Sequence, residues 1–457
     1  MSKLTFGRRI IYTDTPTITE QNVVAVLRKA LGTHMANSYE INYLYNYYKG
    51  KQPILERVKV IRPEINNKSV ENRANEIVSF KVGYLTGEPI QYIGRGADDA
   101  VSDKINTLNE TMFGNDKAAQ DKELAEWFFI CGVAYRMVLP GNSDDLFNIY
   151  TLDPRQTFVV YHSGLGNYPV MGVKYVTLET GENVYSVYTD SMYYEIAADR
   201  VRVATAHVLQ SIPIVEYPAN MARLGAFEIV LTKLDALNLL ESNRLDGVDQ
   251  FIQSFLVFEN CNISIDQFEA LKELGAIKVS GEPGMPATVK PIVSELNQTQ
   301  TQVLVDYIYQ SVLTICGMPN RNATSGSTSD TGSAVILRAG WSDAEARARD
   351  TELIFKKSEK QFLKIVLRIL RDLIALDLKM KDIDIKFTRR ATDNILTKSQ
   401  SLQNLLEAGV HPLEAIATSG LFNDATDVYK KSAAYLEKWL VKPAVVTPGN
   451  NKPNPTE

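Results

Sequence analysis

The sequence predicts a predominantly helical α+β protein. Residues 226–257, 297–316 and 342–378 carry apolar side chains at helical spacing over long stretches. Between about 135 and 216 the pattern changes to alternation, in short runs separated by Gly, Asn, Asp and Pro. Such runs are typical of a meander of antiparallel strands. The chain therefore consists of a strand-rich block with helices before and after it.

The composition is that of an ordinary globular protein. The 457 residues are 45% apolar and 23% charged, which is enough chain for a core and for two to four domains. The 49 basic and 54 acidic residues give a net charge of −5, which argues against a polycation that coats nucleic acid. No apolar run approaches the roughly 18–20 residues of a membrane span, and residues 1–9 do not begin a signal peptide. We expect a soluble intracellular protein without a membrane partner.

Motifs of enzymes and metal sites are missing. The chain has no Cys-x-x-Cys pair, no His-x-x-x-His spacing and no Gly-x-Ser-x-Gly turn. The only Gly-Lys, at residues 50–51, is followed by Gln52 rather than Ser or Thr, so it is not a P-loop. Three widely spaced cysteines fit a reducing compartment. We expect no catalytic residue, no metal and no cofactor.

The first 135 residues are predicted to be mostly helical. A capping box at 17–20 precedes one helix, and a second, with a stripe of tyrosines between Tyr39 and Tyr48, stops at Gly50. The stripe could stack on bases, but a core or subunit-contact face is the favoured interpretation. Further helices are expected at 66–86 and 100–135, with a strand at 87–93.

The helix at 226–257 has an acidic face without Lys or Arg. At 100° per residue four carboxylates fall within about 60° of each other, opposite the apolar face: Glu228, Asp235, Asp246 and Asp249. An ordinary solvated face is the plainer interpretation. The next helix, 297–316, contains one charge, Asp306, and should therefore be covered by something.

Three further segments complete the chain. Residues 258–296 predict a compact unit of strands and a short helix with a turn-rich tip at 281–286. Residues 320–333 are a polar, low-complexity loop, for which mobility is favoured over a phosphate nest. After the long helix come a short strand at 384–387, small helices at 395–440 and a proline-containing tail.

This order of elements resembles the portal proteins of tailed bacteriophages, in particular the siphovirus type found in phages of Gram-positive bacteria. Four stretches carry the resemblance: 75–90, 153–161, 227–258 and 315–320. None is diagnostic alone, but a small unit between two helices, followed by a polar loop and a very long helix, is a specific order. The resemblance covers nearly the whole chain.

The resemblance implies a portal fold assembled as a ring. Its regions would be a wing (1–225, helices plus antiparallel strands), a first stem helix (226–257), a clip (258–296), a second stem helix (297–317), a tunnel loop (318–333), a long wing helix and strand (334–392), a crown (393–442) and a disordered tail (443–457).

The resemblance also implies a function and partners. About twelve copies would form a channel at one capsid vertex, through which double-stranded DNA is packaged and ejected. The terminase large subunit and a head-completion or adaptor protein would dock on the ring, and major capsid and scaffolding proteins would surround it. The protein would be assembled in the host cytoplasm and would act in the virion as the head–tail connector.

Within that architecture, three groups of residues become candidate sites. The acidic face of 226–257 would line the channel and repel the DNA backbone, unless it meets a neighbouring subunit. The tunnel loop would contribute Asn320, Arg321, Asn322, Thr324, Ser325, Ser327 and Asp330. The clip tip, expected to dock terminase or adaptor, would contribute Glu282, Pro283, Gly284 and Met285.

Two other functions are weighed against this one. Another structural protein of a phage head would lack the helix–clip–helix–loop order. A metal-dependent nuclease would need clustered carboxylates, whereas the adjacent pairs Asp98–Asp99 and Asp144–Asp145 read as solvated turns.

Overall fold

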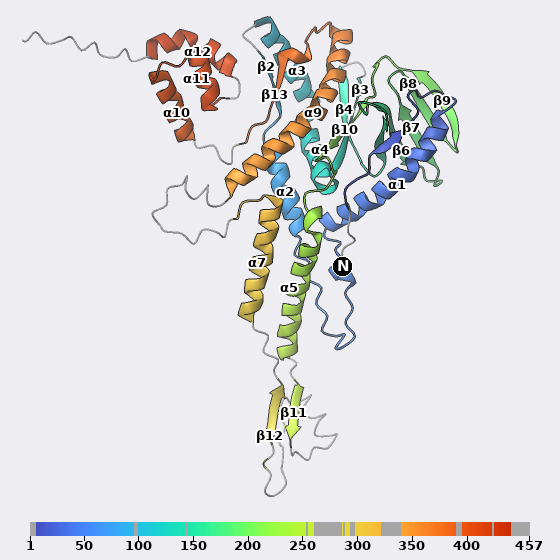
Figure 1. Cartoon of the computed structure of the whole chain (residues 1–457), viewed down its shortest axis with the longest axis vertical. Coiled ribbons are helices and arrows are strands. Elements are labelled where there is room, and N and C mark those ends of the chain that lie inside the picture. The colour runs from blue at the N-terminus through green and yellow to red at the C-terminus, as the bar shows by residue number, and fades with distance from the viewer. Residues whose placement is uncertain are drawn as a thin grey trace, which may run out of the picture.

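The computed structural model describes residues 6–95, 99–141, 145–252, 255–259, 286, 288–292, 298–320, 340–389, 395–422 and 425–439. Figure 1 shows a broad body from which two helices, α5 (Leu231–Ile252) and α7 (Gln298–Cys316), project downward. The chain is 51% helix and 19% strand, which confirms the predicted mixed, predominantly helical composition. No described helix is long and apolar enough to cross a membrane.

The strand-rich block forms two sheets rather than the single predicted meander. The larger has the order β1-β5-β6-β7-β8-β9, with β1 parallel to β5 and the other neighbours antiparallel. Its strands are β1 (Ile11–Thr13), β5 (Thr157–His162), β6 (Pro169–Thr177), β7 (Asn183–Tyr188), β8 (Met192–Ala197) and β9 (Arg200–Ala206). The smaller sheet, β10-β3-β4, joins β10 (Ile214–Pro218), β3 (Val133–Pro140) and β4 (Phe147–Leu152). Alternation identifies strands but not their partners.

Several helix boundaries differ from the predicted ones. The two helices expected before Gly50 are one continuous helix, α1 (Val23–Tyr48), followed by a 3₁₀ turn, η1 (Pro53–Glu56). The helix expected at 66–86 begins only at Arg73, as α2 (Arg73–Thr86). The stretch 100–135 contains α3 (Asp99–Gly114) and α4 (Lys117–Cys131), and α4 ends at Gly132. Gly132 has φ +79°, and a Cβ there would lie 2.2 Å from the carbonyl oxygen of Arg223, so only glycine fits.

The second half of the chain returns to the body after the projection. A 3₁₀ turn, η2 (Glu228–Val230), leads into α5, and a strand pair, β11 (Phe255–Glu259) with β12 (Thr288–Ile292), lies beyond the far ends of α5 and α7. The long helix is α9 (Trp341–Ile374), whose N-cap Gly340 has a left-handed backbone conformation. Then follow η4 (Met380–Asp382), β13 (Ile383–Lys386), which pairs with β2 (Gln91–Gly94), and α10 (Ile395–Glu407), α11 (Pro412–Ser419) and α12 (Ala425–Trp439). The helix and strand expected between 261 and 285, and the tail, lie outside the described residues.

The core contains a buried cluster of four charged side chains from three elements. Lys117 and Asp121 come from α4, Arg136 from β3 and Glu359 from α9, and all four are buried. Nζ of Lys117 lies 2.7 Å from Asp121 and 2.9 Å from Glu359. Arg136 lies 2.5 Å from Asp121 and 3.3 Å from Glu359. The two positive and two negative charges alternate, so each charge has two opposite partners.

Two tyrosines complete the hydrogen bonding of Glu359. The hydroxyl of Tyr92, on β2, donates to Oε1 at 2.6 Å, and that of Tyr217, on β10, donates to Oε2 at 2.7 Å. Burial alone would raise the pKa of Glu359, but Lys117 and Arg136 outweigh it, and the pKa lies below its ordinary value. The carboxylate therefore stays charged and holds five elements together.

We expect Glu359→Gln to reduce the free energy of unfolding by about 3–5 kcal/mol, because it leaves Lys117 and Arg136 with one carboxylate in a buried site. Urea unfolding would measure this. The matched control is Asp372→Asn on the same helix, whose exposed pair with Arg371 spans 3.5 Å and should matter little. Equal effects of the two substitutions would contradict this role of the cluster.

The same carboxylate predicts a pH dependence. Because the pKa of Glu359 is lower in the folded than in the unfolded chain, its contribution is complete above the unfolded value of about 4.3 and is lost as the pH falls below it. The stability difference between the wild type and Glu359→Gln should therefore shrink between about pH 5 and pH 3. Urea midpoints across that range test this, and a constant difference would be the contrary result.

Candidate functional site

The projecting helices α5 and α7 form an antiparallel pair anchored in the body. At the body end, the side chains of Phe227, Leu234 and Leu237 are buried, and Val312 and Leu313 of α7 are buried beside them. Farther out, Nη1 of Arg244 donates to Oε1 of Gln302 at 2.9 Å, which fixes the register of the two helices. The apolar body ends of α5 and α7 are thus buried in the core. The turns of the two helices farther from the body contact each other and solvent.

The polar face of α5 is covered by the chain's own residues 52–71, which we call the brace. Three backbone amides of the brace donate to three side chains of α5. The amide of Asn67 bonds Asp246 at 2.7 Å, that of Ser69 bonds the Ser242 hydroxyl at 2.9 Å, and that of Glu71 bonds Asn238 at 2.8 Å. The α5 positions are four residues apart, and the brace positions are two residues apart.

This spacing follows from the geometry of the two backbones. Four residues of helix rise about 6.0 Å, and two residues of extended chain rise about 6.6–6.8 Å. Every second amide of an extended segment can therefore meet every fourth side chain of a helix. Residues 66–72 form no helix, contrary to the prediction, and α5 side chains accept hydrogen bonds from three of their amides.

Ion pairs hold the outer end of the brace. Oδ2 of Asp246 lies 3.0 Å from Arg57 and 3.1 Å from Lys59. Burial would raise the pKa of Asp246, but the Asn67 bonds, Lys59 and Arg57 lower it below its ordinary value. Arg57 also donates to Oδ1 of Asn243 at 2.6 Å. Asp246 is thus a buried, charged anchor for two basic side chains.

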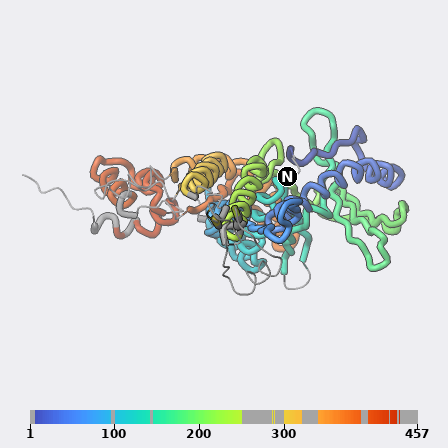
Figure 2. Tube along the Cα trace, turned by 90° about the horizontal axis from the view of Figure 1, so that it is seen from below, coloured from blue at the N-terminus to red at the C-terminus, as the bar shows by residue number. Residues whose placement is uncertain are grey.

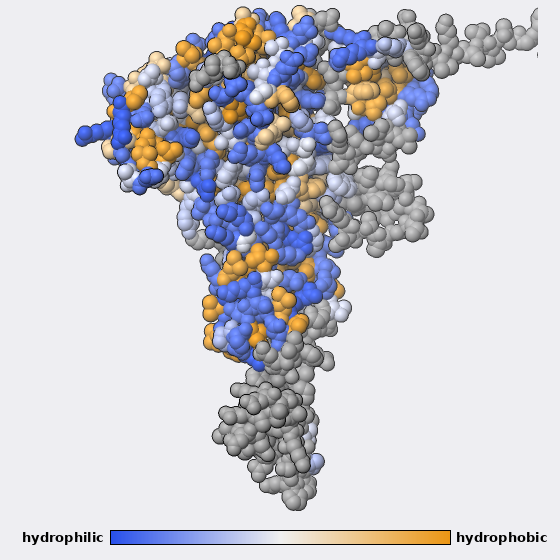
Figure 3. Space-filling view, turned by 180° about the vertical axis from the view of Figure 1, so that it is seen from behind, coloured by the Kyte–Doolittle hydropathy of each residue, from blue (hydrophilic) through white to orange (hydrophobic). Residues whose placement is uncertain are grey.

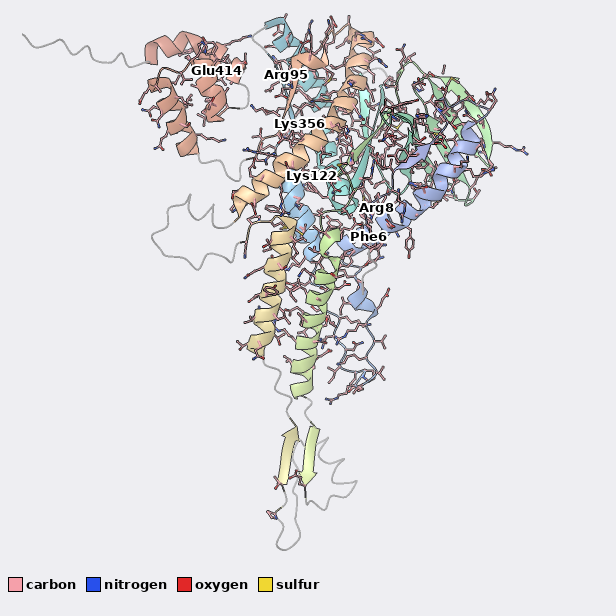
Figure 4. The ribbon with its side chains drawn as sticks, viewed as in Figure 1. Phe6, Arg8, Arg95, Lys122, Lys356 and Glu414 are labelled. Atoms are coloured by element: carbon pink, nitrogen blue, oxygen red, sulfur yellow. The ribbon has the colours of Figure 1, made fainter. Side chains whose placement is uncertain are left out.

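The structure buries two of the four carboxylates of the expected acidic face and leaves Asp235 and Asp249 partly exposed. Glu228 is buried and accepts from Arg8 at 2.6 Å and from the amide of Gly225 at 2.8 Å; Figure 4 shows Arg8 near the body end of α5. Asp246 is buried beneath the brace, Asp235 accepts from the Tyr47 hydroxyl at 3.1 Å, and Asp249 accepts from Asn67 at 2.7 Å. All four carboxylates meet the N-terminal part of the same chain, and two of them are neutralised by Arg or Lys.

The tyrosine stripe of α1 belongs largely to the core. Tyr47 is fully buried and stacks on Phe227 with ring centroids 5.8 Å apart. The hydroxyl of Tyr48 donates to Glu126. Only Tyr39 of the stripe's tyrosines is strongly exposed, at 61%. The core interpretation therefore applies to Tyr47, and for Tyr39 the subunit-contact interpretation stays a prediction.

Helix α7 is covered on one side only. Val305, Val312, Leu313 and Cys316 are buried, but Val303, Leu304 and Tyr307 are 64%, 45% and 67% exposed. On α5, Leu239, Leu245 and Val248 are also close to half exposed. Figure 3 shows apolar side chains scattered over the projection among polar ones. Within the single chain, the cover expected for the nearly uncharged helix is incomplete.

The other predicted sites fall mainly where no structure is described. Asn320 is the last described residue before the gap at 321–339, so Arg321, Asn322, Thr324, Ser325, Ser327 and Asp330 lie outside the described residues. The clip-tip residues Glu282, Pro283, Gly284 and Met285 also lie outside them. In the part of the chain that the structure describes, no three His, Cys, Asp or Glu side chains are grouped as metal ligands.

Sequence reasoning missed the brace because its partners are 167–187 residues away in the chain. A signal was nevertheless present. The cations Arg57 and Lys59 and the amide of Asn67 are partners of the kind that an acidic helix face without its own Lys or Arg requires.

The family model for phage portal proteins of the SPP1 Gp6-like type matches residues 31–437. The chain belongs to the phage portal protein family. As a portal protein it is a structural component of the virion capsid. No curated protein sequence matches it.

Two solved structures of gene transfer agent particles are among those similar to the chain. One, titled as the neck of an empty particle computed with C6 symmetry, is 12% identical, with a TM-score of 0.45 over 76% of this chain and 90% of that chain. The other, titled as the virion of a native particle, is also 12% identical, with a TM-score of 0.43 over 84% of this chain and 94% of that chain.

We expect Asp246→Ala to release the brace from α5, because the amide of Asn67 and two basic side chains lose their acceptor. Hydrogen exchange at Asn67 and Ser69 should accelerate about 10- to 100-fold. The control, Thr232→Ala at an exposed position of α5, should leave exchange unchanged. Unaltered protection in Asp246→Ala would show that the amide ladder does not depend on this carboxylate.

Proposed function

We propose that this portal protein assembles as a ring of about twelve copies at one capsid vertex, and that double-stranded DNA is packaged and ejected through its central channel. The match of the portal family to residues 31–437 carries the proposal. The exposed apolar side chains on α5 and α7 support it, because a helix pair with such faces needs a partner that the single chain does not supply.

In this assembly α5 and α7 are the two stem helices, and residues 258–296 beyond them are the clip. The clip, with residues 282–285 at its tip, docks the terminase large subunit during packaging and the adaptor or head-completion protein afterwards. The two sheets and α1 form the wing beside capsid and scaffolding proteins, and α10–α12 form the crown. Residues 318–333 form the tunnel loop. Assembly takes place in the host cytoplasm.

Of the expected acidic stripe, only Asp235 and Asp249 are exposed enough to line the channel. Glu228 and Asp246 are buried against the protein's own cations, so they do not repel DNA from the surface of α5. We therefore assign them to positioning the stem. The protein itself carries no catalytic role, and the ATP hydrolysis of packaging belongs to the terminase.

The ring predicts a particle of roughly 610 kDa for twelve copies of the 51.1 kDa chain, with a central hole. Native mass spectrometry and negative-stain images of the same sample test this. Single copies, both alone and with capsid and scaffolding proteins, would contradict the proposal. Metal-dependent cleavage of plasmid DNA by such single copies would favour the nuclease instead.

A further inference from the structure

The two flanks of the stem differ in shape. Helix α5 packs against α7 on one side and against η1 of the brace on the other. Figures 1 and 2 both show α5 between α7 and the brace. One flank of the stem is therefore the outer face of α7, and the opposite flank is formed by the brace with α1.

The flank formed by the brace and α1 is hollow. A groove of about 1070 Å³ lies between α1, residues 51–58 and α5. Its walls include Tyr39 of α1, Leu55 of η1 and Leu239 of α5, each between 44% and 61% exposed. Lys51 and Arg57 also line it. Glu56 and Asp235 line it as well, so the groove has apolar walls and carries as many acidic as basic side chains.

The opposite flank is a protruding apolar surface. On α7, the exposed side chains of Val303, Leu304 and Tyr307 lie within five residues, with the exposed carboxylate of Asp306 among them. Asp306 is the only acidic residue of this helix. The surface is thus mainly apolar, and its exposed side chains complement the apolar walls of the groove.

The groove and the surface lie at the same height along the stem. The contact between Arg244 and Gln302 sets a common level on the antiparallel helices. Leu239 lies five residues from Arg244 toward the body, and Tyr307 lies five residues from Gln302 toward the body. Because both helices rise about 1.5 Å per residue, Leu239 and Tyr307 are level.

We propose that α7 of one copy seats its exposed apolar side chains at 303–307 against the apolar walls of the groove of the next copy. The proposal rests on the ring of the proposed function. A ring is built from a heterologous contact, in which two different patches on opposite flanks of one chain meet. Rotation about an axis along the stem keeps the height of each residue, so the groove and the surface of neighbouring copies meet level.

A cysteine pair tests this contact in the full chain. Leu55→Cys and Tyr307→Cys are introduced together, with Cys261→Ser; the remaining Cys131 and Cys316 are buried. A short bifunctional maleimide should join the two new thiols between copies and give a ladder of covalent multimers on a denaturing gel. The opposite flanks of α5 keep the two positions apart within one copy. The control pair, Leu165→Cys with Tyr307→Cys, places the first thiol on an exposed turn of the wing and should give no ladder.

Native mass spectrometry of the same samples measures the mass of the assembly, so that ring formation and this contact are tested separately. Rings that give the ladder support the inference. Rings without it overturn the inference and leave the proposed function standing. Single copies throughout would contradict the ring and the inference with it.

A charge in the contact gives a second test. Tyr307→Asp should raise the concentration needed for half-assembly about tenfold or more, because a carboxylate would enter the apolar wall of the groove. Leu165→Asp should leave assembly unchanged, and Tyr307→Phe should retain it. Full assembly of Tyr307→Asp at wild-type concentrations would overturn the inference.

Discussion

The buried alternation of Lys117, Asp121, Arg136 and Glu359 is the constraint on which the rest of the molecule depends. Its ion pairs hold the long helix α9 against α4 and β3, because separating these buried charges from their partners is energetically costly. Helix α9 in turn reaches α7, because Nη1 of Arg347 donates to the carbonyl oxygen of Ile315 at 2.7 Å, in the last turn of α7. The position of α7 is therefore set by the core rather than by contacts along the stem alone.

Helix α5 is positioned by different interactions, in which its polar side chains accept hydrogen bonds from the backbone amides of the brace. Asn238, Ser242 and Asp246 accept from alternate amides of an extended segment, so helix and brace satisfy each other's hydrogen bonds. Glu228 with Arg8 secures the body end of the same helix. Both the core cluster and the contacts of α5 bury charged side chains away from water. Each of these charges therefore needs a partner of opposite charge.

Periodicity in the sequence predicted the helices that carry the stem. The helices expected at 226–257 and 297–316 correspond to α5 and α7, and the unit of strands expected at 258–296 contains β11 and β12, because helical spacing and alternation are local properties. The pairing of β2 with β13 and the division of the strands into two sheets depend on residues far apart in the chain. The acidic face shows the same limit. A helical wheel correctly placed four carboxylates together but could not show that the chain's own residues 57–67 would cover Asp246.

The brace links the position of α5 to the surface offered to a neighbouring copy. Arg57 pairs with Asp246 and also lines the groove, so the residues that hold the helix build one wall of the hollow beside it. Loosening the Asp246 anchor should consequently widen the groove and weaken its fit to α7 of the next copy, even though Asp246 itself is buried. Through this coupling the buried carboxylate of Asp246 would affect ring assembly indirectly, without touching DNA or a neighbouring copy.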